Sequence, residues 1–303
     1  MNHFEIFKSG GSILQKNPQV TSDKPVVNKP DHTYDKRRLS YAGTFKNPLK
    51  ILAIRSIEWA TAKFTLLRLI RKFEQSGAPF GVPFWGKALA QMGIDIETPM
   101  PEIANIPKTG PVVIVSNHPH GLVDGMILAE LVCRVRPDFK ILTRSLLTGI
   151  PEIAEFMIPV PFSHEDDSRE LGLKMRKDTM QHLKNGGVII LFPAGKVAAS
   201  ETFFGPAIEA DWNPFSHKMI MRSAATVVPV CFTGQNTRVY LIANKISATL
   251  RQGLLLYEIR KALFKAQRPF VGAALKPEDL RKWSDNPRGF LAWLREQTLS
   301  LPR

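Results

Sequence analysis

Cysteine and long apolar runs are both scarce in this sequence. Only Cys133 and Cys231 occur among the 303 residues, too few for a disulfide framework or a thiolate zinc site. We therefore expect a protein of a reducing compartment. No run of about 18 uncharged apolar residues occurs, so we predict no simple membrane-spanning helix. Residues 1–25 also lack the apolar core of a secretory signal.

Several catalytic signatures are missing as well. The sequence has no Gly-x-Ser-x-Gly nucleophile elbow, no Gly-x-x-x-x-Gly-Lys phosphate loop and no Gly-x-Gly-x-x-Gly dinucleotide loop. We expect both cysteines to be buried and unreactive, although Arg134 follows Cys133. Any catalysis is therefore expected to use an organic base, with no cofactor and no metal.

Positive charge, by contrast, is abundant. The chain has 41 Lys and Arg against 27 Asp and Glu, a net charge of +14. The flanks 1–110 and 236–303 have net charges of +7 and +8, whereas 111–235 has −1. A nucleic-acid enzyme is expected to concentrate positive charge at its working centre. A neutral centre between basic flanks predicts an anionic membrane surface as partner and no nucleic acid. A basic surface that serves only solubility is the alternative.

The composition divides the chain into three regions. Residues 1–46 are polar and predict a disordered tail. Residues 47–109 predict a helical membrane-associating region that begins with a helix over 47–75, capped by Asn47. The cations of this helix do not share one face, and we expect them to reach lipid phosphates: Arg55, Lys63, Arg68, Arg71 and Lys72. Packing of the helix on its own domain is the alternative. Residues 110–303 predict the main domain, with its core in 110–235.

Short apolar runs alternate with helical segments in this main domain. The expected strands are 111–116, 139–144, 157–162, 188–193, 226–232 and 270–275, and the two prolines of 157–162 favour a sheet edge. The expected helices are 125–135, 150–156, 168–185 and 246–266. The alternation predicts an α/β fold with a mainly parallel sheet flanked by helices.

The segment between the first strand and the first helix contains the candidate chemistry. It reads Ser116-Asn117-His118-Pro119-His120-Gly121-Leu122-Val123-Asp124-Gly125. In α/β sheets such loops form ligand sites, and a His oriented by an Asp can act as a general base. Asp124 as a simple helix cap is the alternative. His-x-His followed by Asp also occurs in metallohydrolases, but the other histidines form no second cluster, so we predict no metal site.

Four segments together resemble the glycerolipid acyltransferase (lysophosphatidate acyltransferase) superfamily. Asn117-His118 followed by Asp124 resembles its His/Asp box, and Leu191-Phe192-Pro193-Ala194-Gly195-Lys196 resembles its Phe-Pro-x-Gly box. Val228-Pro229-Val230 resembles its final strand box, and the stretch from Ile141-Leu142-Thr143-Arg144 to Ile158-Pro159-Val160 resembles its acceptor-binding region. The four segments follow the order of the family across 110–235.

Two positions depart from the common pattern of the family. Five residues separate His118 from Asp124, where four are usual, and Ala194 replaces the usual Glu. This form resembles the bacterial branch that is labelled hemolysin-like. The missing carboxylate weakens the expectation of a strict lysophosphatidate enzyme.

The resemblance implies transfer of an acyl group from a coenzyme A or acyl carrier protein thioester to a hydroxyl of a lysolipid. It implies His118 as the base and Asp124 as the residue that orients it, with Asn117 and loop N–H groups at the oxyanion. Arg144, Gly195 and Lys196 are the implied acceptor-binding residues. The expected location is the cytoplasmic face of the inner membrane, peripheral or monotopic. The alternatives are a lyso-ornithine or other aminolipid acceptor, and a non-catalytic membrane-surface binding protein.

Overall fold

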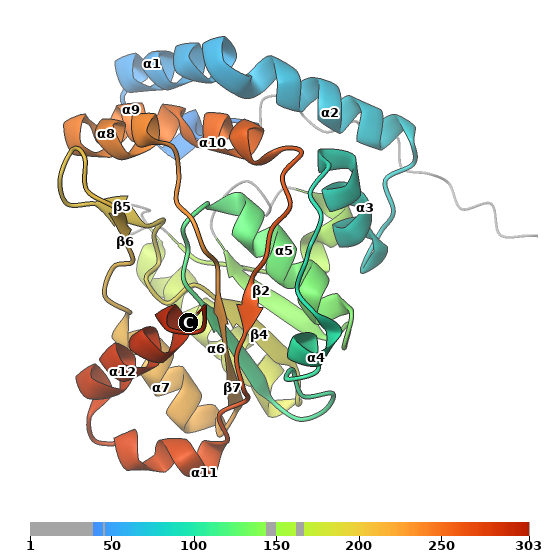
Figure 1. The fold of residues 1–303 in the computed structure, drawn as a ribbon, viewed down its shortest axis with the longest axis vertical. Coiled ribbons are helices and arrows are strands. Elements are labelled where there is room, and N and C mark those ends of the chain that lie inside the picture. Colours follow the sequence, from blue (N-terminus) through green and yellow to red (C-terminus); the bar gives the residue numbers. More distant parts are fainter. Residues whose placement is uncertain (1–38, 45, 144–149, 162–166, 303) are drawn as a thin grey trace, which may run out of the picture. The chain divides into compact units, whose positions relative to one another are not determined.

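The computed structural model describes residues 39–44, 46–143, 150–161 and 167–302, and all of these belong to one compact unit (Figure 1). Its centre is a sheet of six strands in the order β3-β2-β4-β1-β7-β8. The strands are β1 Val112–Ser116, β2 Phe139–Thr143, β3 Met157–Pro159, β4 Val188–Leu191, β7 Thr226–Cys231 and β8 Phe270–Val271. Only the pairing of β7 with β8 is antiparallel among them. The predicted mainly parallel sheet is confirmed, and β3 occupies the predicted edge.

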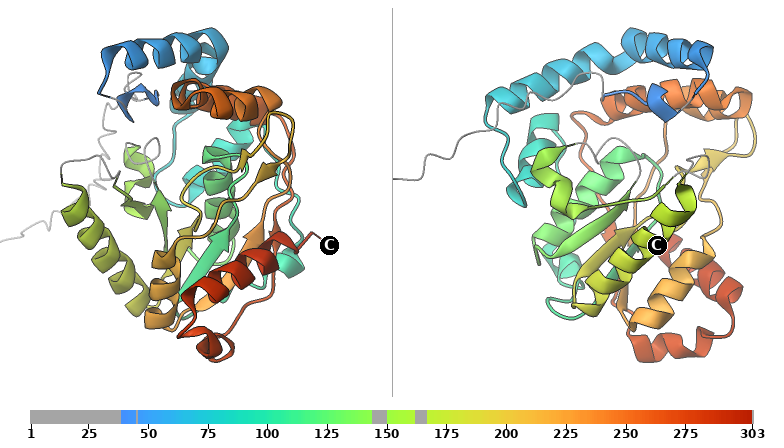
Figure 2. Two further views of the ribbon diagram at one scale, coloured as in Figure 1. Left: turned by 90° about the vertical axis from the view of Figure 1, so that its left-hand side faces the viewer. Right: turned by 180° about the vertical axis from the view of Figure 1, so that it is seen from behind.

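The central strand β1 is apolar along its length because both faces of the sheet are covered. Val112 and Ile114 belong to one core cluster, whereas Val113 and Val115 belong to the other, as the alternation of strand side chains requires. Helices α3 (Pro83–Met92) and α5 (Leu122–Cys133) cover the first face. The second face is covered by α6 (Ser168–Lys184), α7 (Pro214–Ser223) and α12 (Pro287–Leu299) (Figures 1 and 2).

A further helical layer brings the first helices of the described chain against helices that follow β7. Here α1 (Pro48–Glu58) and α2 (Phe64–Gln75) pack against α9 (Ala248–Gly253) and α10 (Leu255–Ala262), as Figures 1 and 2 show. A π-helical turn, Trp59–Lys63, joins α1 to α2, and the Asn47 side chain caps α1 as predicted. Short elements complete the described chain: α4 Met100–Ile103, α8 Arg238–Ile246, α11 Pro277–Leu280, three 3₁₀ turns (Ala42–Thr44, Pro151–Phe156, Arg281–Trp283), and the hairpin of β5 Ala199–Ser200 with β6 Ala207–Ile208.

Three sequence predictions need correction. The single helix expected over 246–266 is divided between α9 and α10 and ends at Ala262; it begins only after Ser247, which is extended and caps α9 with its side chain. The end of the predicted disordered tail 1–46 is packed instead, since Leu39, Tyr41 and Ala42 are buried, whereas residues 1–38 lie outside the described residues. Lys63 is also buried, at 5% exposure, and is therefore not one of the surface cations. The proposed boundary at 109–110 stays a prediction.

One arginine ties together the amino ends of three neighbouring strands. The Arg136 side chain is buried and donates to the carbonyl oxygens of Gly110 (2.9 Å), before β1, and Gly186 (2.6 Å), before β4. It also forms a two-pronged ion pair with Asp138, before β2, at 2.5 and 2.6 Å. A planar fork of donors suits this arrangement, and a lysine would not reproduce it.

We predict that Arg136→Ala lowers the free energy of unfolding by about 2 kcal/mol, because the carbonyl oxygens of Gly110 and Gly186 lose a charged hydrogen-bond donor. Arg134→Ala is the matched control: Arg134 pairs with Glu130 on the surface of α5, a contact worth less than about 1 kcal/mol. Urea unfolding of both variants measures the difference. Equal losses would show that the buried fork has no special role.

Candidate active site

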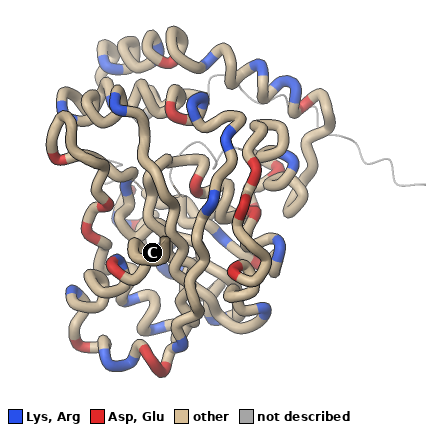
Figure 3. The backbone as a smooth tube through the Cα atoms, viewed as in Figure 1, with Lys and Arg blue, Asp and Glu red and all other residues tan. Residues whose placement is uncertain are grey.

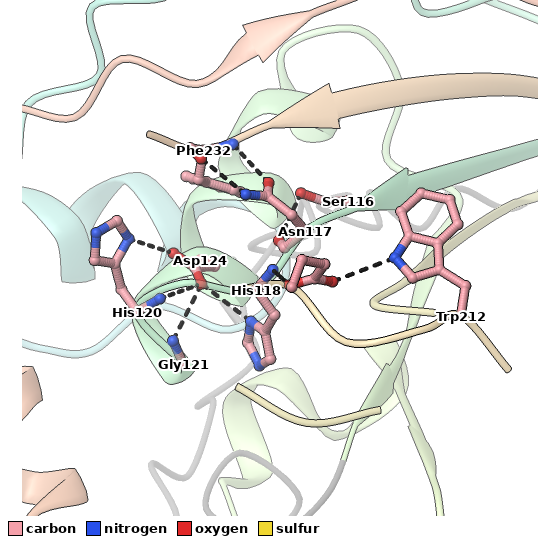
Figure 4. Close-up of polar contacts among 9 residues, drawn as sticks. Ser116, Asn117, His118, His120, Gly121, Asp124, Trp212 and Phe232 are labelled. Carbon is pink, nitrogen blue, oxygen red and sulfur yellow. Dashed lines mark hydrogen bonds and ion pairs between the residues drawn. The ribbon is translucent and has the colours of Figure 1, made fainter. Parts of the chain in front are cut away.

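The carboxylate of Asp124 is the centre of the site. Asp124 lies in the first turn of α5, and its side chain is fully buried. Its Oδ2 accepts from Nδ1 of His118 (3.0 Å) and from the backbone N–H groups of His120 (2.9 Å) and Gly121 (3.1 Å). Its Oδ1 accepts from Nδ1 of His120 at 3.0 Å (Figure 4). The structure thus brings the two predicted residues His118 and Asp124 together and adds a second imidazole.

The charge state of Asp124 fixes the tautomer of both rings. Burial alone would raise the pKa of Asp124, but the hydrogen bonds and charges of His118 and His120 outweigh it and lower that pKa to about 2. The carboxylate is therefore ionised and accepts hydrogen bonds only. Each Nδ1 must then carry the hydrogen, which leaves each Nε2 of a neutral ring with a lone pair.

His118 is held from several directions. Its ring stacks on Phe192, which directly follows β4, with 3.9 Å between ring centroids and 20° between planes. Its backbone N–H donates to Oε2 of Glu209 at 3.1 Å, and its carbonyl accepts from the N–H of Ala198 at 2.9 Å. The ring thus has a fixed orientation at the carboxyl end of β1, where parallel sheets form ligand sites.

Asn117 connects this loop to the neighbouring strand β7. Its Nδ2 donates to the carbonyl of Phe232 and its Oδ1 accepts from the N–H of Phe232, both at 2.8 Å (Figure 4). One amide hydrogen of the buried Asn117 side chain is therefore committed to the backbone. Its predicted role at the oxyanion stays a prediction.

Two of the three predicted acceptor-binding residues, Gly195 and Lys196, lie in the turn after β4. The Gly195 N–H donates to the carbonyl of Phe192 at 2.9 Å, and Gly195 adopts a φ of 65°, which favours glycine. Gly195 and Lys196 are both exposed. Arg144, the third predicted residue, lies outside the described residues. No structural feature tests the acceptor role of this set.

Glu209 is a site residue that the sequence analysis missed. It is buried, it holds the backbone of His118, and its Oε1 accepts from Nε1 of Trp212 at 3.3 Å. Burial raises the pKa of Glu209, although its hydrogen bonds oppose the shift. It lies 91 positions from His118, and nothing in the local sequence indicates that contact.

Over the described ranges, no three His, Cys, Asp or Glu side chains are grouped so that they could hold a metal ion. None of the helices in the described part of the chain has the length and apolar character needed to cross a bilayer.

Comparison with known proteins supports the predicted resemblance. A family model described as Acyltransferase matches residues 100–233, which include the whole Asp124 cluster. The match covers less than half of the chain, and residues 100–233 are similar to this family. The predicted resemblance to the superfamily is therefore confirmed, whereas the hemolysin-like branch stays a prediction.

Two known proteins align with this chain. The lyso-glycine lipid O-acyltransferase of Bacteroides thetaiotaomicron is 28% identical over 161 residues, which are 51% of this chain and 55% of that protein. The match thus spans about half the length of the relative. A solved structure, the 1-acyl-sn-glycerophosphate (LPA) acyltransferase PlsC from Thermotoga maritima, aligns with 18% identity and a TM-score of 0.41, over 83% of this chain and 96% of its own. At that similarity the alignment adds nothing to the family resemblance.

The depressed pKa of Asp124 predicts a pH-dependent stability. Its folded-state pKa of about 2 lies below the ordinary value of 3.8, so its contribution is present above about pH 4 and is lost as the pH falls toward 2. The difference corresponds to about 2 kcal/mol. We expect the gap in unfolding free energy between wild type and Asp124→Asn to shrink by that order between pH 6 and pH 2. Urea titrations at several pH values measure it, with Asp178→Asn, on the surface of α6, as control. A gap that does not change with pH would contradict the depressed pKa.

Proposed function

We propose that this protein transfers a fatty acyl group from an acyl thioester to a hydroxyl of a lysolipid, with His118 as the general base. One observation carries the proposal: within the segment that is similar to the acyltransferase family, the His118 ring is fixed on the buried Asp124 carboxylate at the carboxyl end of β1. The donor is coenzyme A or acyl carrier protein. No further cofactor takes part, because a thioester is already activated.

In the proposed reaction, Nε2 of His118 accepts the proton of the acceptor hydroxyl while the hydroxyl oxygen attacks the thioester carbonyl. Asp124 stabilises the imidazolium, a role that its ionised, buried carboxylate suits. The tetrahedral intermediate then collapses, the thiolate leaves, and the imidazolium returns the proton to the sulfur. Asn117 contributes to the oxyanion site with the amide hydrogen that Phe232 does not use.

The acceptor is the part of the proposal with two candidates. A lysophospholipid follows from the superfamily, and Arg144, Gly195 and Lys196 are proposed to bind its anionic head. An aminolipid is the second candidate. It is favoured by the name of the Bacteroides relative, a lyso-glycine lipid O-acyltransferase, and by Ala194 at the position of the usual Glu.

The activity is tested with palmitoyl-CoA and either lysophosphatidate or lyso-glycine lipid. We expect wild-type protein to acylate one of them, and His118→Asn to lower kcat by about 10²- to 10⁴-fold, because asparagine has no basic Nε2. EDTA is not expected to inhibit. Loss of activity in EDTA with recovery on added zinc would replace the organic base by a metal mechanism.

We further propose peripheral binding to an anionic membrane, at the cytoplasmic face of the inner membrane. The helix pair α1–α2 presents exposed apolar side chains, namely Leu49, Leu52, Trp59 and Phe64, at 54–75% exposure. The same two helices also carry exposed cations, namely Lys50, Arg55, Arg68, Arg71 and Lys72. Figure 3 shows Lys and Arg positions along both helices. Such a combination binds a lipid interface by apolar insertion and by attraction to phosphates, at about 1 kcal/mol per cation.

The two contributions are separable in vesicle binding. We expect Leu52→Gln/Phe64→Gln to leave weak binding that salt abolishes, and Arg68→Gln/Arg71→Gln to weaken binding to anionic vesicles while the remainder resists salt. Leu171→Gln/Leu173→Gln is the matched control, since these side chains are exposed on α6. Sedimentation with phosphatidylglycerol vesicles measures binding. If the control weakens binding as much as the α1–α2 variants, the membrane contact lies elsewhere.

A further inference from the structure

The second histidine of the loop is not used in the reaction proposed above. Asp124 nevertheless contacts His120 as closely as His118, with 3.0 Å for each Nδ1–Oδ pair. The two rings are also similarly accessible, at 16% and 17% exposure. Exposure and distance to Asp124 therefore do not distinguish His118 from His120. Any difference in their roles must come from the residues around each ring.

The two oxygens of Asp124 have unequal sets of donors. Oδ2 receives three hydrogen bonds, one of them from Nδ1 of His118. Within the described part of the chain, Oδ1 has one hydrogen-bond donor, Nδ1 of His120. Without this donor, Oδ1 of the buried Asp124 carboxylate would have no hydrogen bond. Rotation of the carboxylate or uptake of a proton would then lower its free energy. Either change would disturb the contact with His118.

The opposite side of the His120 ring is closed by the backbone after β7. A Cβ atom placed on Gly234, whose φ is 92°, would lie 3.1 Å from Nε2 of His120. The ring thus fits between Asp124 and a position that has no side chain. His118, in contrast, has its ring face on Phe192 in the turn that contains Gly195 and Lys196.

We propose that His120 is a positioning residue, whose Nδ1–H holds Oδ1 of Asp124 so that Oδ2 stays on Nδ1 of His118. The expected effect on kcat rests on the proposed function, whereas the expected effect on the His118 tautomer does not. The hydrogen bond from His120 to Oδ1 is present in both charge states of His120, because Nδ1 carries a hydrogen in the protonated ring as well.

The charged neighbours of His120 agree with this role. They are Asp124 on α5, Glu258 on α10 and Lys265 after α10. Burial and Lys265 oppose a charge on His120, but the hydrogen bond and charge of Asp124, with Glu258, raise its pKa overall. A protonated His120 ring donates a stronger hydrogen bond to the carboxylate than a neutral one, and the raised pKa favours the protonated ring.

Asparagine separates positioning from base catalysis. Its Nδ2 is bonded to Cγ, as Nδ1 of histidine is, so it retains the donor to Oδ1 and removes the basic Nε2. We expect His120→Asn to keep kcat within about tenfold of wild type and His120→Ala to lower it by about 10²-fold, the effect of a misplaced catalytic group. The assay uses palmitoyl-CoA with lyso-glycine lipid or lysophosphatidate, and His118→Asn is the matched variant at the other ring. Equal loss in His120→Asn and His120→Ala would make His120 a base, and full activity of His120→Ala would remove its role.

Nitrogen-15 NMR of the imidazole rings tests the proposal without turnover. We expect His118 in the Nδ1–H tautomer in wild type and His120→Asn, and in a mixture of tautomers in His120→Ala. An unchanged His118 tautomer in folded His120→Ala would overturn the proposal. If wild-type protein acylates neither lipid, the proposed function fails while this comparison still decides the positioning role.

Gly234→Ala provides a variant that leaves both histidines in place. The added Cβ pushes against Nε2 of His120, so we expect the same tautomer mixture at His118 and a loss of activity in the same direction. Gly110→Ala is the control for backbone strain, because its φ is 79° and a Cβ there would meet no atom within 4 Å. Equal effects of the two variants would assign the loss to strain and contradict the contact with His120.

Discussion

An ionised carboxylate buried at the start of α5 accepts hydrogen bonds from two imidazoles and two backbone N–H groups, and the rest of the site is built around it. A buried carboxylate without partners would take up a proton. Here the donors of His118 and His120, with the amino end of a helix, keep Asp124 charged. The donors are in turn fixed by the carboxylate. The loop after β1 thus has one favourable arrangement, and that arrangement turns the His118 ring toward the end of the sheet.

The ends of two neighbouring strands and one segment after a hairpin confine this loop. Asn117 binds the backbone of Phe232 after β7, and Phe192 after β4 supports the face of His118. Glu209 holds the backbone of His118 from the segment that follows the β5–β6 hairpin. At the other end of the same strands, Arg136 joins the segments before β1, β2 and β4. Contacts at both ends thus fix the register of the central strands, as catalytic preorganisation requires.

The helical layer of α1, α2, α9 and α10 serves packing and surface properties at once. Ile54, Leu66 and Phe73 are buried, while other apolar residues of the same helices remain exposed. Glu58 is buried and accepts from Ser40 and from the N–H of Tyr41, which ties the segment before α1 to the helix. Lys63 lies beside it over the ring of Trp59. The same helices thus bury some apolar residues in the core and expose others, together with most of their cations.

The sequence by itself determined the α/β class, the strands β1, β2, β4 and β7, and the pairing of His118 with Asp124. These features depend on local patterns: apolar runs of strand length, a helix start, and residues spaced across a strand–helix turn. Only the tertiary structure decided the contacts of Glu209, the stacking on Phe192 and the close approach of Gly234 to His120, because those residues are far apart in the chain. The break before α9 has a local cause that the sequence prediction missed, since the Ser247 side chain accepts from the N–H of Thr249 and caps the helix. His120 lies in the same segment, 116–125, as His118 and Asp124. The spacing alone did not show that the Asp124 carboxylate would bind both imidazole rings.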